Sequence, residues 1–213
     1  MSTPTDSPAA PAVADPAPLG LAAFALTTFL LSVVNAHWAT SSSTLAWLGY
    51  ALAYGGLVQL LAGMWEFKNK NVFGATAFST YGGFWIGLFF YIRVVVVGGL
   101  VHSGVQVHRD LGWILLAFAI FNTYMLIIST QLTTAVFAVF LTLELTEIIL
   151  FIGNFSISAS QIANGDTSAV IKIGGIVGVI TALTAWYASA AGVLNGLKGK
   201  VVAPVGGPLM KIG

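Results

Sequence analysis

Two glutamates stand within an otherwise apolar stretch of the chain. Glu144 and Glu147 are three residues apart, so a helix carries both on one face. A charge at membrane depth costs about 2.5–3.5 kcal/mol on insertion scales, and neighbouring carboxylates repel. We therefore expect one of them to hold a proton at neutral pH, as proton coupling requires. The alternative is a pair of structural acids, hydrogen-bonded to Thr142 and Thr146 or lying near the membrane interface.

The other polar residues favour neither catalysis nor metal binding. The chain has no cysteine, which excludes thiolate sites and disulfides. His37, His102 and His108 lie between apolar stretches without a ligand spacing, and we interpret them as solvated loop residues or sensors of external pH. An intramembrane enzyme using the two glutamates lacks further partners at their depth. We expect no enzyme, no catalytic residue, no cofactor and no metal.

Gln59, Glu66 and Asn71 bracket the charged turn near residue 68. Glu66 lies beside Lys68 and Lys70, which indicates a solvated turn with a local ion pair. Gln59 is deeper in the preceding apolar stretch, where an amide needs a partner, and we expect it to line a pathway. Thr80 belongs to a polar and glycine-rich stretch at membrane depth, which should face protein or a pathway rather than lipid.

Composition places the chain in the membrane. It has 213 residues, of which 57% are hydrophobic and only 7% charged, against about 25% charged in an average soluble domain. The net charge of +1 gives no basic surface for nucleic acid. We expect the lipid bilayer to be the partner of most of the surface, and a multi-pass protein of the plasma membrane.

Six apolar segments each approach the roughly 20 residues that cross about 30 Å of hydrocarbon. The fold class is therefore an all-α membrane protein with six transmembrane helices. More lysines and arginines gather on the side of the termini than on the other, which favours cytoplasmic termini. The expected spans are Leu19–Val34, Leu45–Trp65, Val72–Val97, Leu111–Thr130, Leu132–Ile152 and Val170–Leu194.

The chain divides into three parts. Residues 1–14 are rich in proline, alanine, serine and threonine and are expected to be a disordered tail. Residues 15–196 form the six-helix domain, and residues 197–213 a cytoplasmic tail. Pairs of small residues four apart allow close helix packing within one bundle or between chains; they are Gly83/Gly87, Gly174/Gly178 and Gly192/Gly196.

The first helix begins at a proline-rich stretch, Asp15-Pro16-Ala17-Pro18-Leu19-Gly20-Leu21. Proline is tolerated in the first turn, where free amides and the positive end of the macrodipole can receive a carboxylate. Leu19 and Gly20 are therefore candidates for substrate binding, together with Gln59 and Thr80. The alternative is a plain helix start. An ionised Asp15 would cap this helix but repel an anion placed against it.

Two motifs carry a family resemblance. Phe73 to Trp85 reads FGATAFSTYGGFW, and Asp15 to Leu21 reads DPAPLGL with Asp15 in place of an asparagine. Both resemble the AceTr family of acetate and succinate transporters, also called the GPR1/FUN34/YaaH family, over Asp15 to about Gly196. The resemblance implies an apolar constriction in a central pore, at the positions of Phe24, Tyr81 and Leu143. It also implies a hexameric ring of subunits, each with its own pore.

The resemblance further implies a channel-like transporter of acetate and related short carboxylates, including succinate, with proton coupling. Acetate resembles a side-chain carboxyl with a pKa somewhat above 4, so it is charged at neutral pH and crosses lipid poorly. Some fungal relatives are linked to ammonium export or to acetate adaptation. The alternative functions are therefore an ammonium exporter and a non-transporting membrane sensor or scaffold.

Overall fold

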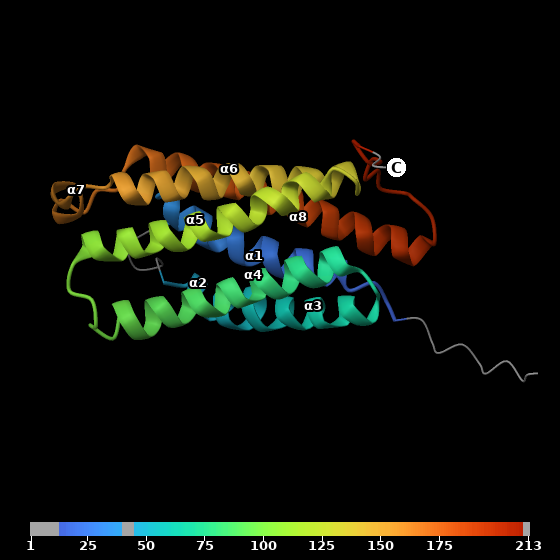
Figure 1. Cartoon of the computed structure of the whole chain (residues 1–213), viewed down its shortest axis with the longest axis horizontal. Coiled ribbons are helices and arrows are strands. Elements are labelled where there is room, and N and C mark those ends of the chain that lie inside the picture. The colour runs from blue at the N-terminus through green and yellow to red at the C-terminus, as the bar shows by residue number, and fades with distance from the viewer. Residues whose placement is uncertain (1–12, 40–44, 211–213) are drawn as a thin grey trace, which may run out of the picture.

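Six long apolar helices lie side by side in one bundle (Figure 1). The structure is a computed structural model that describes residues 13–39 and 45–210. Within those residues the regular structure is entirely helical. The chain is thus an all-helical protein with six candidate membrane spans, as the sequence predicts. The spans are Ala17–Asn35, Trp47–Lys68, Val72–Val96, Gly104–Ser129, Thr134–Ser156 and Ala169–Lys198.

Two of the spans change their helical form along their length. The first turn of the second span is α2 (Trp47–Tyr50), followed by the π-helical η2 (Ala51–Val58) and by α3 (Gln59–Lys68). The third span is α4 (Val72–Phe90) continued by the π-helical η3 (Tyr91–Val96). The others are α1 (Ala17–Asn35), α5 (Gly104–Ser129), α6 (Thr134–Ser156) and α8 (Ala169–Lys198), with the short α7 (Ala159–Ala163) before α8.

The fourth span begins earlier than its apolar run. Helix α5 starts at Gly104, whereas the apolar pattern predicts Leu111. The polar residues that precede Leu111 extend the helix, and hydropathy marks only the part of a helix that suits hydrocarbon. His108 therefore lies in a helix rather than in a loop.

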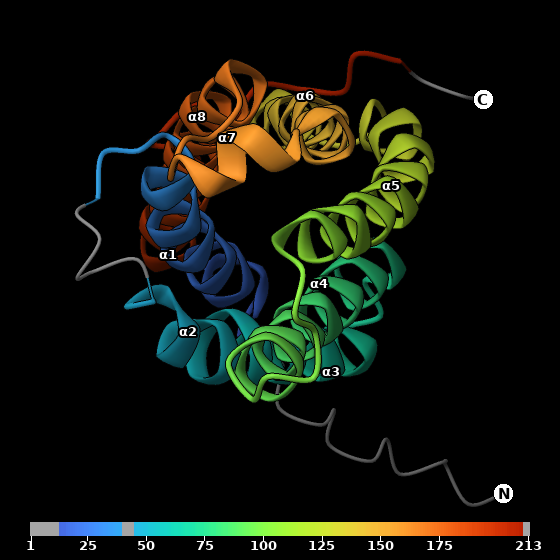
Figure 2. The same cartoon turned by 90° about the vertical axis from the view of Figure 1, so that its left-hand side faces the viewer.

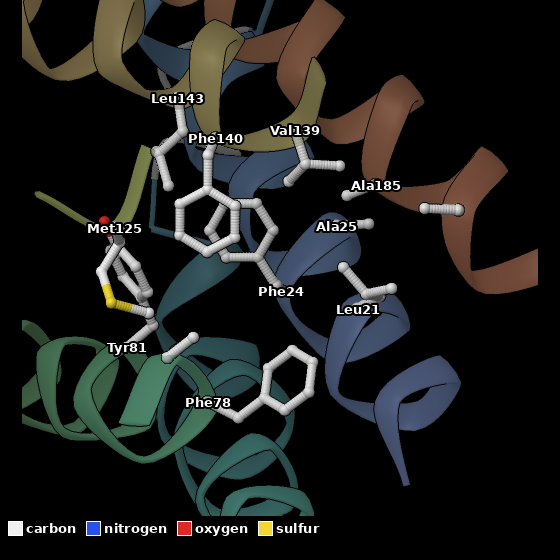
Figure 3. Packing of buried hydrophobic residues seen from close by; sticks show 12 residues of the cluster. Leu21, Phe24, Ala25, Phe78, Tyr81, Met125, Val139, Phe140, Leu143 and Ala185 are labelled. Carbon is white, nitrogen blue, oxygen red and sulfur yellow. The ribbon is translucent and has the colours of Figure 1, made fainter. Parts of the chain in front are cut away.

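The helices surround a common axis (Figure 2). Helix α1 packs against α8 and η2, α6 packs against both α8 and α5, and α3 packs against α4. Aromatic rings join α4 to α5, with the centroids of Phe84 and Phe118 4.7 Å apart. The main cluster of buried apolar side chains comes from five of these helices and lies on the axis (Figure 3).

Glycines set how closely α1 and α8 approach. A Cβ atom on Gly175 would lie 2.3 Å from the backbone nitrogen of Ala36, and one on Gly178 would lie 2.3 Å from Ser32 Oγ. A Cβ atom added to Gly83 or Gly87 on α4 would instead meet nothing within 4 Å among the described residues. The Gly174/Gly178 pair therefore packs inside the bundle, whereas the Gly83/Gly87 pair faces its exterior.

The segment that follows α8 runs back over the bundle. Gly199 ends the helix in the left-handed conformation, at φ 60°. Ala135 N donates to Val205 O at 2.9 Å, and Leu209 N donates to Thr130 O at 2.8 Å. Residues 201–210 thus lie against the ends of α5, α6 and α8. Figure 1 shows this segment at the same end as the start of α1 and the α3–α4 turn, which we call the inner end.

Candidate functional site

A row of four cavities follows the axis of the bundle. The outer cavity, lined by Trp47 and Asn154 among others, has a volume of about 80 Å³. The upper cavity follows at about 40 Å³ and is lined by Thr28, Trp85 and Glu147, among other residues. The lower cavity, which Gln59 lines, has about 20 Å³. The inner cavity opens to about 410 Å³ at the inner end. The space is therefore narrowest in the middle.

Neighbouring cavities share walls, which shows that they lie in sequence. The outer and upper cavities share Leu31, Asn35, Phe84, Leu115 and Leu150. The lower and inner cavities share Leu21, Ala77, Phe78 and Phe140. The upper and lower cavities share only three lining residues, which are Phe24, Tyr81 and Leu143.

These three residues, which we call the collar, come from α1, α4 and α6. All are buried in the main apolar cluster, and Figure 3 shows their side chains pointing toward the same space. The rings of Phe24 and Tyr81 meet edge to face, with centroids 5.7 Å apart. The residues that family resemblance singled out thus stand together where the row of cavities is interrupted.

The hydroxyl group of Tyr81 leads from the collar into a buried polar network. Tyr81 Oη lies 3.1 Å from Asn122 Oδ1 and 3.2 Å from Glu147 Oε1. Asn122 Nδ2 donates to Phe140 O at 3.0 Å and to Glu144 Oε2 at 2.7 Å. Thr123 Oγ1 lies 2.7 Å from Glu144 Oε1. The two glutamates are thereby linked through Asn122 and Tyr81.

Counting protons in this network distinguishes the glutamates. A backbone carbonyl only accepts, so the contact with Phe140 O fixes the orientation of the Asn122 amide and makes its Oδ1 face Tyr81. Tyr81 has one proton to donate, and Asn122 Oδ1 can only accept it. Both contacts of Tyr81 Oη are therefore hydrogen bonds at the same time only when Glu147 is protonated and donates to Tyr81.

Glu144 has the surroundings of a carboxylate. It accepts from Asn122 Nδ2, and its other oxygen lies 2.7 Å from Thr123 Oγ1, whose single proton can go to that oxygen or to Ala119 O at 2.8 Å. Glu147 has no such donors, since its Oε2 is buried and has no hydrogen-bond partner among the described residues. The surroundings of Glu147, which also lines the upper cavity, therefore suit a neutral acid, whereas the amide donor gives Glu144 the better place for a negative charge.

The substrate-binding candidates are spread over the bundle. Gln59 is buried and lines the lower cavity, and its Oε1 has no partner among the described residues. Leu19 is 47% exposed. Gly20 packs under the ring of Phe78. Leu19, Gly20 and the half-buried Thr80 line none of the four cavities.

The side chain of Asp15 lies at the start of α1. Asp15 Oδ1 accepts from Ala17 N, the first amide of α1, at 2.9 Å, which places a carboxylate at the start of the helix where an anion would bind. The interpretation of Glu66 as a solvated turn residue is wrong. Its side chain is 0% exposed, and Asn69 Nδ2 donates to it at 3.2 Å. Helix α3 extends to Lys68, which turns Glu66 toward Gly74 on α4.

Sequence reasoning missed several polar residues of the axis. Asn122 is a lone amide in the apolar fourth span, and that isolation was a usable signal. Thr28 and Trp85 resemble any threonine or tryptophan in a membrane helix, so no sequence signal marked them. His108 Nδ1 lies 2.7 Å from Asn154 Oδ1, and Asn154 lines the outer cavity.

The sequence matches one known family of membrane proteins over almost its whole length. The model of the GPR1/FUN34/YaaH family matches residues 2–206, and the chain belongs to this family. Acetate permease A of Emericella nidulans is 39% identical over 90% of this chain and 65% of its own. Ammonia transport outward protein 2 of Saccharomyces cerevisiae is 38% identical over 84% of this chain and 61% of its own.

This chain covers nearly the full length of a bacterial relative and of a solved structure. Succinate-acetate/proton symporter SatP of Escherichia coli is 31% identical over 91% of this chain and 96% of its own. The solved structure of the bacterial acetate channel SatP superimposes with a TM-score of 0.79 at 32% identity, over 91% of this chain and 99% of that one. The chain spans less than two thirds of the length of the two fungal relatives named above.

These likenesses and the six apolar helices make the chain a multi-pass membrane protein. The relatives named above are transporters or channels, which fits a protein that is not an enzyme.

Proposed function

We propose that this chain conducts acetate and related short carboxylates across a membrane along its axial cavities. The observation that carries the proposal is that Phe24, Tyr81 and Leu143 alone are shared by the two central cavities. A solute that follows the axis must pass this collar. The names of the relatives, acetate permease and succinate-acetate/proton symporter, support acetate as the substrate, with succinate as a second one.

The collar is suited to select small organic acids. An apolar constriction dewets, and it blocks hydrated ions. The cavities on either side, of about 40 and 20 Å³, have room for one to a few water molecules each. A small acid with one polar end and one methyl group can exchange water for wall contacts over such a short distance. Gln59, in the lower cavity, is our candidate for receiving it on the inner side of the collar.

Transport is proton-linked in our proposal. In it Glu147 carries the exchangeable proton; this is supported by the contacts of Tyr81, whose hydroxyl can donate to only one of Asn122 and Glu147. Glu144 stays ionised and, through Asn122, holds the network in place. In this proposal Glu147 exchanges the proton and Glu144 has a structural role, whereas the sequence alone did not distinguish the two glutamates.

The assembly that we propose is a hexameric ring in the plasma membrane, with a pore in each subunit and cytoplasmic termini. The outward Gly83/Gly87 pair and the exposed apolar side chains of α5, such as Ile120 and Ile127, offer surfaces for neighbouring copies.

Flux into liposomes tests the proposal. Purified protein in liposomes should take up labelled acetate faster than empty liposomes, and an inward proton gradient should raise the rate. Tyr81→Ala removes one wall of the collar and should let inorganic ions leak. Tyr50→Ala, at an exposed tyrosine of α2 that lines none of the four cavities, is the matched control and should behave like the unchanged protein. Uptake no faster than in empty liposomes would contradict the transporter proposal.

Ammonium export is a second candidate, supported by the name of a yeast relative, ammonia transport outward protein 2. The same liposomes, loaded with ammonium, separate the two functions. Ammonium release without acetate uptake would favour the exporter. Absence of both fluxes would favour a sensor or scaffold.

A further inference from the structure

A groove lies on the flank of the bundle, away from the axis, and we call it the lateral groove. It has a volume of about 490 Å³ and is lined by the start of α6, by α8 and by the segment that follows α8. Among the described residues it shares no lining residue with the four axial cavities. Leu183 and Tyr187, which line it, are 55% and 48% exposed. The groove therefore opens to the outside of the bundle, where a membrane protein meets lipid.

The polar side chains of the groove are already paired. They are Thr134, Thr184 and Tyr187, and each donates a hydrogen bond to a backbone carbonyl. Each hydroxyl group thereby uses its only proton. Over the described part of the chain the lining offers a ligand no free side-chain donor, so it suits an apolar occupant.

The segment that follows α8 gives the groove a fixed rim. Asn195 Oδ1 accepts from Val202 N at 2.7 Å and from Ala203 N at 2.9 Å, and Asn195 Nδ2 donates to Ala203 O at 2.9 Å. Gly206 has a φ of 68°, and a Cβ atom on it would lie 2.3 Å from Thr134 Oγ1. Because the segment is bonded to α8 and lies close against α6, the groove is present before any ligand binds.

Helix α8 places two lysines beyond the groove. The helix has 30 residues and is therefore about 45 Å long, which exceeds the roughly 30 Å of hydrocarbon. Its inner end projects toward the headgroups and carries Lys198, and Lys200 follows it. Leu197 and Val201, beside these lysines, are 79% and 71% exposed. Exposed apolar and cationic side chains together are typical of a protein surface at headgroup level.

We propose that the lateral groove binds an anionic phospholipid of the leaflet at the inner end, with an acyl chain in the groove and the phosphate at Lys198 and Lys200. Lysines at the membrane surface favour anionic headgroups, and the paired polar side chains favour a hydrocarbon chain. An anionic lipid matches both parts, whereas an apolar face of a second copy of this chain would match the groove alone. This inference goes beyond the proposed transport function and does not depend on it.

The bound chain lies beside a helix of the collar. Thr184 lines the groove, and its Oγ1 is 3.3 Å from Oγ1 of Thr142, the residue before Leu143 on α6. A lipid in the groove therefore contacts both α6 and α8 where they pack together. Because it binds only the folded chain, it should raise the unfolding temperature.

Native mass spectrometry of the purified full chain tests the site. The delipidated protein is titrated with phosphatidylglycerol, which is anionic, and separately with phosphatidylcholine, which has no net charge. One phosphatidylglycerol per chain should be retained at the lowest concentrations, and it should raise the unfolding temperature more than phosphatidylcholine does. Equal retention of the two lipids would overturn the anionic headgroup.

Filling the groove tests where the acyl chain lies. Ala138→Phe adds a ring to the lining and should abolish retention of phosphatidylglycerol. Leu183→Trp fills the same groove from α8 and gives an independent result should Ala138→Phe fail to fold. Ala53→Phe adds the same ring at an exposed position of η2 that lines neither the groove nor the axial cavities, and it should bind like the unchanged protein.

Removing charge tests where the headgroup lies. The double variant Lys198→Gln/Lys200→Gln should weaken phosphatidylglycerol binding about tenfold, because each lysine near the surface attracts an anionic lipid. Lys68→Gln/Lys70→Gln removes two charges at the same end of the bundle, in the α3–α4 turn (Figure 1), and should leave the binding unchanged. Equal effects of the two double variants would overturn the headgroup position.

The remaining outcomes concern the groove itself. If both groove-filling variants retain phosphatidylglycerol as tightly as Ala53→Phe, the site is wrong. If no form of the protein retains lipid and Ala138→Phe changes the number of chains in the assembly, the groove is a contact between copies and the lipid site is wrong as well. Neither result alters acetate uptake by the unchanged protein, so the transport proposal is judged by its own experiment.

Discussion

Tyr81 combines two roles in one side chain. Its ring is a wall of the collar, with Phe24 at a centroid distance of 5.7 Å. Its hydroxyl group reaches past the collar to Asn122 and Glu147. A single residue thus couples the narrowest point of the pathway to the acid that we propose as the proton carrier.

Tyr81→Phe separates these roles. The ring remains, so the collar should stay closed to inorganic ions. Asn122 Oδ1 and Glu147 Oε1 lose their partner while buried, and the free energy of unfolding should fall by about 1–3 kcal/mol. Acetate uptake should also lose its response to a proton gradient. Thermal unfolding and liposome flux measure the two effects, and an unchanged gradient response would show that the hydroxyl group has no part in coupling.

At the scale of the elements, close contact of α1 and α8 holds the collar residue Phe24 in place. Glycine at positions 175 and 178 lets the two helices approach within the reach of a single methyl group. The hydrophobic effect does not drive helices together in lipid, so close van der Waals packing is a main cause of helix association. The alignment of α1 with the axis therefore depends on residues outside the pathway.

Gly175→Ala should separate α1 from α8. The added Cβ would lie 2.3 Å from the backbone nitrogen of Ala36, which a rotamer change cannot relieve. We expect a loss of about 1–3 kcal/mol in unfolding free energy and slower acetate uptake. Gly83→Ala adds the same methyl group where it meets none of the described residues within 4 Å, so the single chain should remain as stable or become more stable. Thermal unfolding of both variants in detergent makes the comparison, and equal losses would contradict it.

At the scale of the whole molecule, an even number of spans places the two ends of the bundle's chain on one side. The start of α1 and the segment after α8 meet at the inner end, and Pro208 of that segment lines the inner cavity. The row of cavities is asymmetric, with about 410 Å³ at the inner end and about 80 Å³ at the outer one.

Single introduced cysteines report which side of the membrane each end faces, because the chain has no cysteine of its own. Lys70→Cys lies in the α3–α4 turn at the inner end, and Asp166→Cys lies between α7 and α8 at the other end. With cytoplasmic termini, an impermeant thiol reagent added to intact cells should label Asp166→Cys and leave Lys70→Cys unlabelled until the cells are opened. The reverse pattern would invert our proposed topology.

Much of the fold was predictable. Six apolar runs gave six spans with starts and ends mostly within a few residues, because hydrocarbon thickness imposes their length. The start of α5 was not predictable, since the helix extends beyond the apolar run. The π-helical segments η2 and η3 left no sequence pattern either.

The site was predictable only in part. Phe24 and Tyr81 were found through motifs, and Glu144 and Glu147 through their cost in a membrane. Thr28 and Trp85 carry no such cost, so only the structure brings them to the cavity. Glu66 misled the sequence analysis because its neighbours are charged, whereas its burial depends on how α3 packs against α4.

From the sequence alone one can predict a membrane protein with six candidate spans and two acids that lipid cannot accept. Composition and local periodicity decide these properties, because the solvent acts on each helix separately. The tertiary structure was needed to see the hydrogen bonds on which our proposal for the neutral acid rests, the helices that form the collar and the polar atoms that surround a common cavity. These depend on distances between residues far apart in the chain, such as Tyr81 and Glu147, and no local pattern encodes them.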